Sequence, residues 1–174
     1  MKKVAVIILA VCMLLSGCSV LQDVTPFIEI TEKGFSVEDY GLQITADSTF
    51  RENTGGSFDL QITNDDAYIS VMAYKYIDLP EDTTPADVFD MQNDDLLSKR
   101  TAVNVIEEAT TEGAITKALY SAEKDGVKNY YGSYLMDFPE AQTFAWVLVT
   151  AVPSYFESNR AYLDGIVCSL IPID

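Results

Sequence analysis

The second half of the chain is a series of β-type segments joined by short connections, and this pattern constrains the fold most. Runs of strand-favouring residues occupy 103–106, 114–121, 127–138 and 144–152. Asp125-Gly126 separates the second run from the third, and Asp-Gly between two apolar runs is the strongest short-range signal for a β-hairpin. The sequence leaves open whether that loop has two residues or three. Because strands joined by such short connections run antiparallel, the chain must contain an antiparallel sheet.

The first half adds further strands and a helix. Apolar residues alternate at 40, 42 and 44 and at 58, 60 and 62, and a β-rich run covers 67–77. Thr84-Pro85-Ala86-Asp87 then predicts a helix start, because threonine caps a helix, proline suits its first position and aspartate favours its positive end. This helix should end near Arg100.

A second helix is predicted over residues 153–170, where apolar side chains form one stripe wide enough to cover a sheet. The stripe consists of Phe156, Leu163, Ile166, Val167 and Leu170. Strands followed by a helix, more strands and a terminal helix predict an α+β fold, with a central antiparallel β-sheet flanked by helices.

The N-terminus has the features of a secretory signal. Met1-Lys2-Lys3 is basic, the twelve residues from Val4 to Leu15 are apolar, and small residues follow. A membrane-spanning helix needs about 20 apolar residues, so this run is too short for a permanent transmembrane anchor.

Leu15-Ser16-Gly17-Cys18 resembles the lipobox of bacterial lipoproteins. The resemblance implies cleavage between Gly17 and Cys18, a diacylglyceryl thioether on Cys18 and acylation of the new amino terminus, for example by palmitate. Two or three acyl chains give a stable membrane anchor. Because Ser19 is not an aspartate, the lipobox pattern implies the outer membrane where the organism has one, and otherwise the outer face of the cell membrane.

These signals divide the chain into three segments. Residues 1–17 are the expected signal peptide, 18–33 the lipidated cysteine and a tether, and 34–174 the domain. Alternatively, Phe27, Ile28 and Ile30 dock on the domain as a first strand, which shortens the tether.

The charge and residue inventory exclude several function classes. The chain has 11 Lys+Arg against 27 Asp+Glu, a net charge of −16, and no histidine; losing Lys2 and Lys3 with the signal peptide would make the charge −18. A nucleic-acid partner is not expected, because its phosphates would be repelled. Without histidine, Ser-His-Asp and Cys-His catalysis and imidazole-bound zinc are excluded.

Several motifs together resemble the PsbP-like superfamily, which also includes the Ran-binding Mog proteins. The motifs are Gly34-Phe35-Ser36-Val37, Tyr40-Gly41-Leu42, Thr84-Pro85, the Gly126 hairpin with Tyr130-Tyr131, and the segment from Tyr155 to Leu170. The resemblance implies an α/β/α sandwich used for docking on large assemblies and not for catalysis. No catalytic residue is implied.

Two acidic triplets, Asn64-Asp65-Asp66 and Asn93-Asp94-Asp95, are candidates for Ca²⁺ binding, since Ca²⁺ takes six to eight oxygen ligands. The candidate ligands are Asp65, Asp66, Asp94 and Asp95. Neither triplet continues as an Asp-x-Asp-x-Asp-Gly loop with a distal glutamate. The alternative is that Asn-Asp forms an Asx turn and is solvated. No other cofactor is expected.

Aromatic residues concentrate on adjacent predicted strands. Tyr130, Tyr131, Tyr134 and Trp146 would form a partner-binding platform if they shared an exposed face, because tyrosine and tryptophan anchor interfaces. The alternative is that they face the core under the terminal helix.

The sequence therefore predicts a non-enzymatic accessory lipoprotein, anchored in the membrane through Cys18 and docking another envelope protein. An accessory lipoprotein that binds Ca²⁺ or a small ligand is the alternative.

Overall fold

Two antiparallel sheets and two α-helices account for the regular structure of residues 30–173, the part of the chain that the computed structural model describes. The small sheet has the order β1-β2-β10: β1 (Glu32–Val37), β2 (Leu42–Asp47) and β10 (Ile171–Pro172). The large sheet has the order β3-β4-β5-β9-β8-β7-β6. Its strands are β3 (Arg51–Glu52), β4 (Leu60–Thr63), β5 (Ala67–Lys75), β6 (Thr101–Glu112), β7 (Ile115–Lys124), β8 (Val127–Phe138) and β9 (Thr143–Ala151). The helices are α2 (Pro85–Ser98) and α3 (Pro153–Cys168), and short 3₁₀ turns occupy Glu38–Tyr40, Tyr76–Asp78 and Pro139–Ala141.

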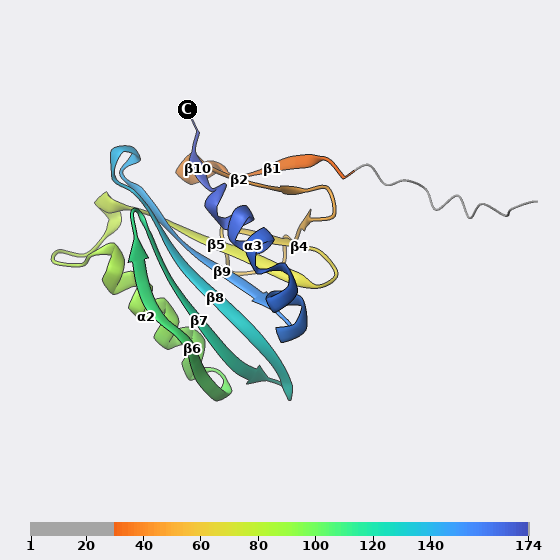
Figure 1. Cartoon of the computed structure of the whole chain (residues 1–174). Helices are drawn as coiled ribbons and strands as arrows, with labels where there is room; N and C mark the ends of the chain where they lie inside the picture. The colour runs from red at the N-terminus through yellow and green to blue at the C-terminus, as the bar shows by residue number, and fades with distance from the viewer. Residues whose placement is uncertain (1–29, 174) are drawn as a thin grey trace, which may run out of the picture.

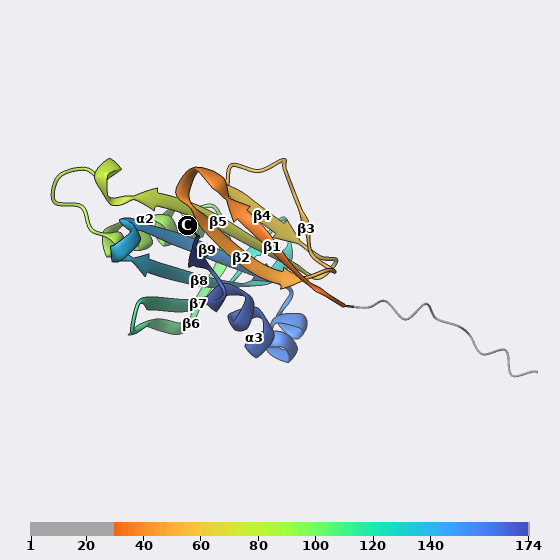
Figure 2. The same cartoon turned by 90° about the horizontal axis from the view of Figure 1, so that it is seen from above.

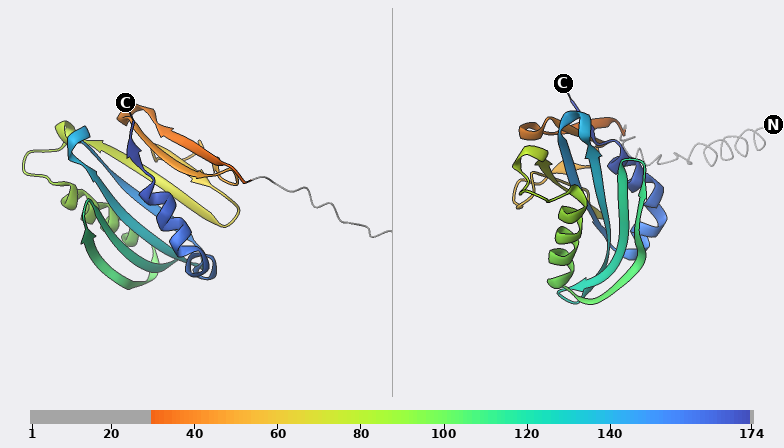
Figure 3. Two further views of the ribbon diagram at one scale, coloured as in Figure 1. Left: turned by 45° about the horizontal axis from the view of Figure 1, so that its top comes forward. Right: turned by 90° about the vertical axis from the view of Figure 1, so that its left-hand side faces the viewer.

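The large sheet lies between two layers (Figure 1). The helix α2 covers one face and α3 the other, and Figure 3 shows the two helices on opposite sides of the twisted sheet. The small sheet packs on the same face as α3, over β4 and β5 (Figure 2). The predicted α+β fold, with helices flanking an antiparallel sheet, is confirmed. The sequence did not predict that β1, β2 and β10 form a separate small sheet.

Because both faces of the central strands are covered, neighbouring residues of one strand enter different cores. On β9, Ala145, Val147 and Val149 face the α3 side. Phe144, Trp146 and Leu148 face α2. Nearly every side chain of β9 is therefore buried, although the strand still alternates between two faces.

The Asp125-Gly126 hairpin has a two-residue loop. Lys124 pairs directly with Val127, and φ is 55° at Asp125 and 77° at Gly126. Positive φ at both central residues is typical of the type I′ turn, which suits the twist of the flanking strands. This register sets which face each residue of β7 and β8 enters.

Both predicted helices form. Thr84 caps α2: the backbone N–H of Asp87 donates to Thr84 Oγ1 at 3.2 Å, and the backbone N–H of Thr84 donates to Asp87 Oδ2 at 2.8 Å. The helix ends at Ser98, two residues before the predicted end. The helix α3 buries its stripe as predicted, and Asn159 interrupts its regular dihedrals.

The domain starts slightly earlier than the sequence indicates. Strand β1 begins at Glu32, not Gly34, and the backbone N–H of Ser48 donates to the carbonyl of Thr31 at 2.7 Å. Ile30 is 64% exposed and does not dock. The predicted signal peptide, Cys18 and the tether through residue 29 lie outside the described residues. Within residues 30–173, neither helix is long and apolar enough to cross a membrane.

Candidate functional site

Three of the four aromatic residues predicted as an exposed platform are buried. Tyr131, Tyr134 and Trp146 are at most 4% exposed. Tyr130 is half-buried, packs edge-to-face on Phe156 at 5.9 Å and donates its hydroxyl to Glu157 at 3.0 Å. These residues do not form a platform because α2 and α3 cover both faces of the strands that carry them. The alternative interpretation, that these residues face the core, is confirmed for Tyr131, Tyr134 and Trp146.

A buried polar network holds Trp146 in a fixed orientation beneath α2. The indole N–H of Trp146 donates to Ser133 Oγ at 2.8 Å, and that hydroxyl donates to Asn93 Oδ1 at 2.6 Å. All three residues are buried, and Asn93 Nδ2 has no hydrogen-bond partner among the described atoms. The network links α2 to β8 and β9 at one defined position.

An apolar groove of about 500 Å³ lies beside α2. We call it the α2 groove; its lining includes Phe58, Met72, Met91, Leu96, Trp146 and Leu148. The ring of Phe58 stacks on Trp146 with centroids 6.3 Å apart, and Met91 is 57% exposed at the rim. Methionine side chains adapt their shape to a partner, so this surface can receive an apolar group.

One end of the α2 groove is cationic. The ammonium of Lys99 lies 2.6 Å from the carboxylate of Asp95, and both side chains are exposed. The guanidinium of Arg100 lies 4.6 Å from the centroid of the Tyr131 ring and donates to the carbonyl of Leu96. Its Nε is buried without a hydrogen-bond partner among the described atoms. The groove therefore combines an apolar floor with a partly desolvated cation.

Sequence reasoning missed the α2 groove because its lining comes from four segments far apart in the chain. Only Met91 gave a local signal. It is a large apolar residue outside the stripe of Val88, Phe89 and Leu96 that packs α2 on the sheet.

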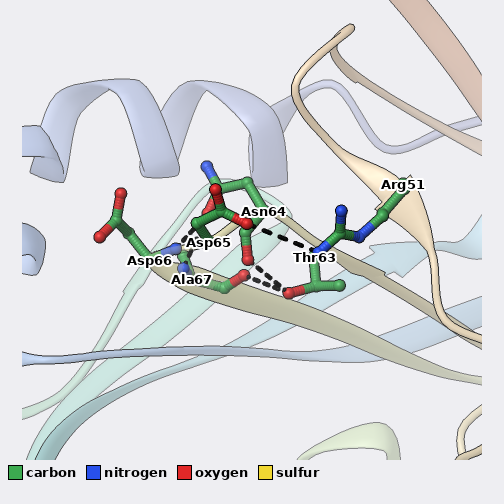
Figure 4. Close-up of polar contacts among 6 residues, drawn as sticks. All are labelled: Arg51, Thr63, Asn64, Asp65, Asp66 and Ala67. Carbon is green, nitrogen blue, oxygen red and sulfur yellow. Dashed lines mark hydrogen bonds and ion pairs between the residues drawn. The ribbon is translucent and has the colours of Figure 1, made fainter.

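The first acidic triplet forms a turn between β4 and β5 (Figure 4). The side-chain oxygen of Asn64 accepts from the backbone N–H groups of Asp66 and Ala67 at 3.0 and 2.8 Å, which makes an Asx turn. Asp65 lies 3.5 Å from Arg51, and both side chains are highly exposed. The oxygen of Asn64 is thus already used by the turn.

The second triplet is divided between core and solvent. Asn93 is buried in the network with Ser133, whereas Asp94 and Asp95 are exposed on α2. Asp95 is paired with Lys99. No group of three or more potential His, Cys, Asp or Glu ligands lies together among the described residues.

The most perturbed titratable groups are tyrosines that donate to carboxylates between elements. Burial, followed by the hydrogen bond to Asp137, raises the pKa of Tyr76 to about 12. Burial and the hydrogen bond to Asp164, 2.5 Å long, raise the pKa of Tyr134 far above its usual value. Burial and the hydrogen bond to Asp47 do the same to the pKa of Tyr162. Raised pKa values keep these phenols protonated, so they act as hydrogen-bond donors that join elements.

Comparison with known proteins shows the fold and no closer relationship. No family model matches the sequence, and no curated protein matches it significantly. Among solved structures, cyanobacterial PsbP (CyanoP) from Synechocystis sp. PCC 6803 is similar with a TM-score of 0.60 and 13% identity, over 82% of this chain and 92% of that one.

Two further structures have the same fold. LpqN of Mycobacterium tuberculosis, described as involved in cell envelope biogenesis, has a TM-score of 0.59 and 15% identity over 84% of this chain and 92% of its own. The Saccharomyces cerevisiae Ran-binding protein Mog1p has a TM-score of 0.55 and 11% identity over 83% and 97%. The chain thus has the PsbP/Mog1 α+β fold, and the fold implied by its motifs is confirmed.

Proposed function

We propose that this protein is a non-enzymatic accessory lipoprotein that docks another envelope protein, with the α2 groove as its docking site. The observation that carries the proposal is the groove itself. Its floor is the side chains of Trp146, Leu148 and Met72, and its rim exposes Met91. Interfaces are anchored by apolar side chains that fill such pockets, surrounded by polar residues.

The floor is held in shape before a partner arrives. Trp146 is oriented by its hydrogen bond to Ser133 and stacks on Phe58. A preformed pocket loses less conformational entropy on binding than one that must assemble, which favours affinity. The exposed Met91 can adjust to the inserted side chain.

The tyrosines with the largest pKa shifts are not candidates for a general base. A general base must lose its proton near neutral pH, and the tyrosines with the largest shifts have raised pKa values instead. They join elements of the fold: Tyr76 to β8, Tyr134 to α3, and Tyr162 to β2.

The envelope location rests on the lipobox at Cys18 and on one fold neighbour. LpqN is described as involved in cell envelope biogenesis, and it shares the fold. A lipid anchor at Cys18 would hold the domain outside the cytoplasm and close to a membrane.

Photo-crosslinking in intact envelopes tests the docking site. A benzoylphenylalanine at Met91 should crosslink to one envelope protein, and the same probe at Asp66, exposed on the β4–β5 turn, should not. Met91→Lys should then reduce co-purification of that protein, because a charge at the rim opposes apolar insertion.

Ile77→Lys is the matched control, since Ile77 is 88% exposed and lies outside the groove. It should leave co-purification unchanged. Equal crosslinking from Met91 and Asp66, or equal loss with both lysine variants, would contradict the α2 groove as the docking site.

A further inference from the structure

We infer that the free edge of β1 accepts an extended, basic segment of a partner protein, which adds to the small sheet as a fourth strand. The inference rests on the proposed docking function, because it takes the occupant of the edge to be a partner protein. It concerns a different surface from the α2 groove.

Of the four sheet edges in residues 30–173, the edge formed by β1 has the longest uninterrupted strand pairing. It pairs with β2 over six consecutive residues, from Glu32 opposite Asp47 to Val37 opposite Leu42, without a register shift. Its other side has no paired strand in the described structure. Its backbone groups are thus available along about 20 Å.

The other three edges are protected. Strand β3 has two residues, and β10 has two, of which one is Pro172. Strand β6 is long, but three register shifts interrupt its pairing with β7. Short edges, proline and bulges are devices by which proteins prevent strand addition, and β1 has none of these three. Its charged residues, Glu32 and Lys33, lie at its first two positions.

The ladder identifies which groups of β1 point outward. The N–H of Ser48 donates to the carbonyl of Thr31, so residue 31 faces β2. Hydrogen-bonding direction alternates along an antiparallel strand. The N–H and C=O groups of Gly34 and Ser36 therefore point away from β2.

A groove of about 530 Å³ runs along this edge, and its charge favours a basic occupant. We call it the β1 groove. Its lining includes the carboxylates of Glu38, Asp39, Glu52 and Asp59 and a single ammonium, that of Lys33. All four acidic residues are exposed.

Ionisable groups near the β1 groove also indicate that its electrostatic potential is negative. Burial and then the carboxylates of Asp59, Asp78 and Asp39 raise the pKa of Tyr40, which lines the groove. The two local cations lie over aromatic rings: Lys33 is 4.6 Å from the centroid of Phe35, and Lys75 is 5.6 Å from that of Tyr40. A second copy of this chain would bring the same carboxylates to the groove, so a basic partner fits better.

The β1 groove and the α2 groove are neighbours. Phe58 lines the α2 groove and the next residue, Asp59, lines the β1 groove. The chain between β3 and β4 therefore contributes a residue to each of the two surfaces.

Hydrogen exchange on the full chain tests the inference, with two eight-residue peptides as probes. In one, lysine alternates with valine and threonine; in the other, glutamate replaces lysine. The basic peptide should slow amide exchange at Gly34 and Ser36, and the acidic peptide should not. Absence of protection, or equal protection by both peptides, would overturn the inference.

Ser36→Pro removes one outward N–H and should weaken binding of the basic peptide about fivefold, equivalent to one backbone hydrogen bond. Ser36→Ala keeps that N–H and should bind as the unchanged chain does. Equal affinities of the two variants would contradict strand addition. Circular dichroism checks that both fold.

A second pair of variants covers the case in which Ser36→Pro does not fold. Glu38→Lys and Glu52→Lys, both at exposed positions, should weaken the basic peptide and strengthen the acidic one. No change in either affinity would overturn the charge argument. If the chain alone is dimeric and already protected at Gly34 and Ser36, the occupant is a second copy and the inference is wrong.

These results separate the two surfaces. If the basic peptide does not protect β1 but the Met91→Lys variant still loses its envelope partner, the proposed docking function stands and strand addition is wrong. If the Met91 experiment fails while the basic peptide protects β1, the α2 groove is not the docking site.

Discussion

Ser133 joins two buried polar side chains in the α2 face of the core. It is fully buried, accepts from the Trp146 indole and donates to Asn93. Ser133→Ala leaves the indole N–H and the Asn93 oxygen without partners, and each unsatisfied buried group costs about 1–3 kcal/mol. We expect the free energy of unfolding in urea to fall by about 2–3 kcal/mol. Ser98→Ala, at an exposed position, should change it by less than about 0.5 kcal/mol; equal effects would contradict the network.

Tyr76 makes stability depend on alkaline pH. Its pKa is about 12 in the folded protein and 10.0 for an ordinary tyrosine. Because the folded state holds this proton more tightly, the contribution is complete below pH 10 and is lost as pH rises toward 12. The difference in unfolding free energy between the unchanged chain and Tyr76→Phe should therefore shrink across this range. Asp137→Asn removes the neighbouring charge and should reduce the same dependence without abolishing it, because burial is the larger cause of the raised pKa of Tyr76. A pH-independent difference between the unchanged chain and Tyr76→Phe would contradict the prediction.

Among the elements, α2 depends on its N-terminal cap. The hydroxyl of Thr84 accepts from the Asp87 N–H, and the Asp87 carboxylate accepts from the Thr84 N–H. Thr84→Ala removes the first bond and should lower the free energy of unfolding by about 1 kcal/mol, a usual cost for losing a helix cap. Thr83→Ala, one residue earlier, is the matched control and should have little effect in the same denaturant titration. If the two variants are equally stable, the cap does not stabilise α2.

The elements that the sequence predicted are those with local signals. The cap at Thr84, the Asp125-Gly126 turn and the stripe of α3 each act through neighbouring residues. Strand β6 was predicted as four residues and has twelve, because its polar second half becomes a strand only by pairing with β7. Strand β10 was not predicted, since it exists only by pairing with β2.

The candidate site could not be predicted for the same reason. Alternating aromatic residues look alike in a strand with one exposed face and in a strand covered on both. Tyr131 and Trp146 are buried because α2 lies over them, and Tyr134 is buried because of α3. The α2 groove needs Phe58, Met72 and Met91 to meet, and only the tertiary fold brings them together.

In the whole molecule, α3 holds the edge of the large sheet against the core. The guanidinium of Arg160 makes two hydrogen bonds of 2.5 Å to the carboxylate of Glu107 on β6. Tyr134 on β8 donates to Asp164, one helical turn further along α3. These contacts tie β6 and β8 to α3.

The position of the domain at a membrane depends, in our prediction, on Cys18. If Cys18 carries the lipid, Cys18→Ser removes the acyl chains and should move the protein from the membrane fraction to the soluble fraction, because neither helix within residues 30–173 is long and apolar enough to cross a membrane. Cys12→Ser and Cys168→Ser make the same chemical change at the other two cysteines and should leave the protein with the membrane. Fractionation followed by a high-salt wash measures the outcome, and mass spectrometry of the N-terminal peptide should find the acyl mass on Cys18. If mass spectrometry shows that residues 1–17 have been removed, a Cys18→Ser protein that stays in the washed membranes would show that the lipobox does not hold this protein there.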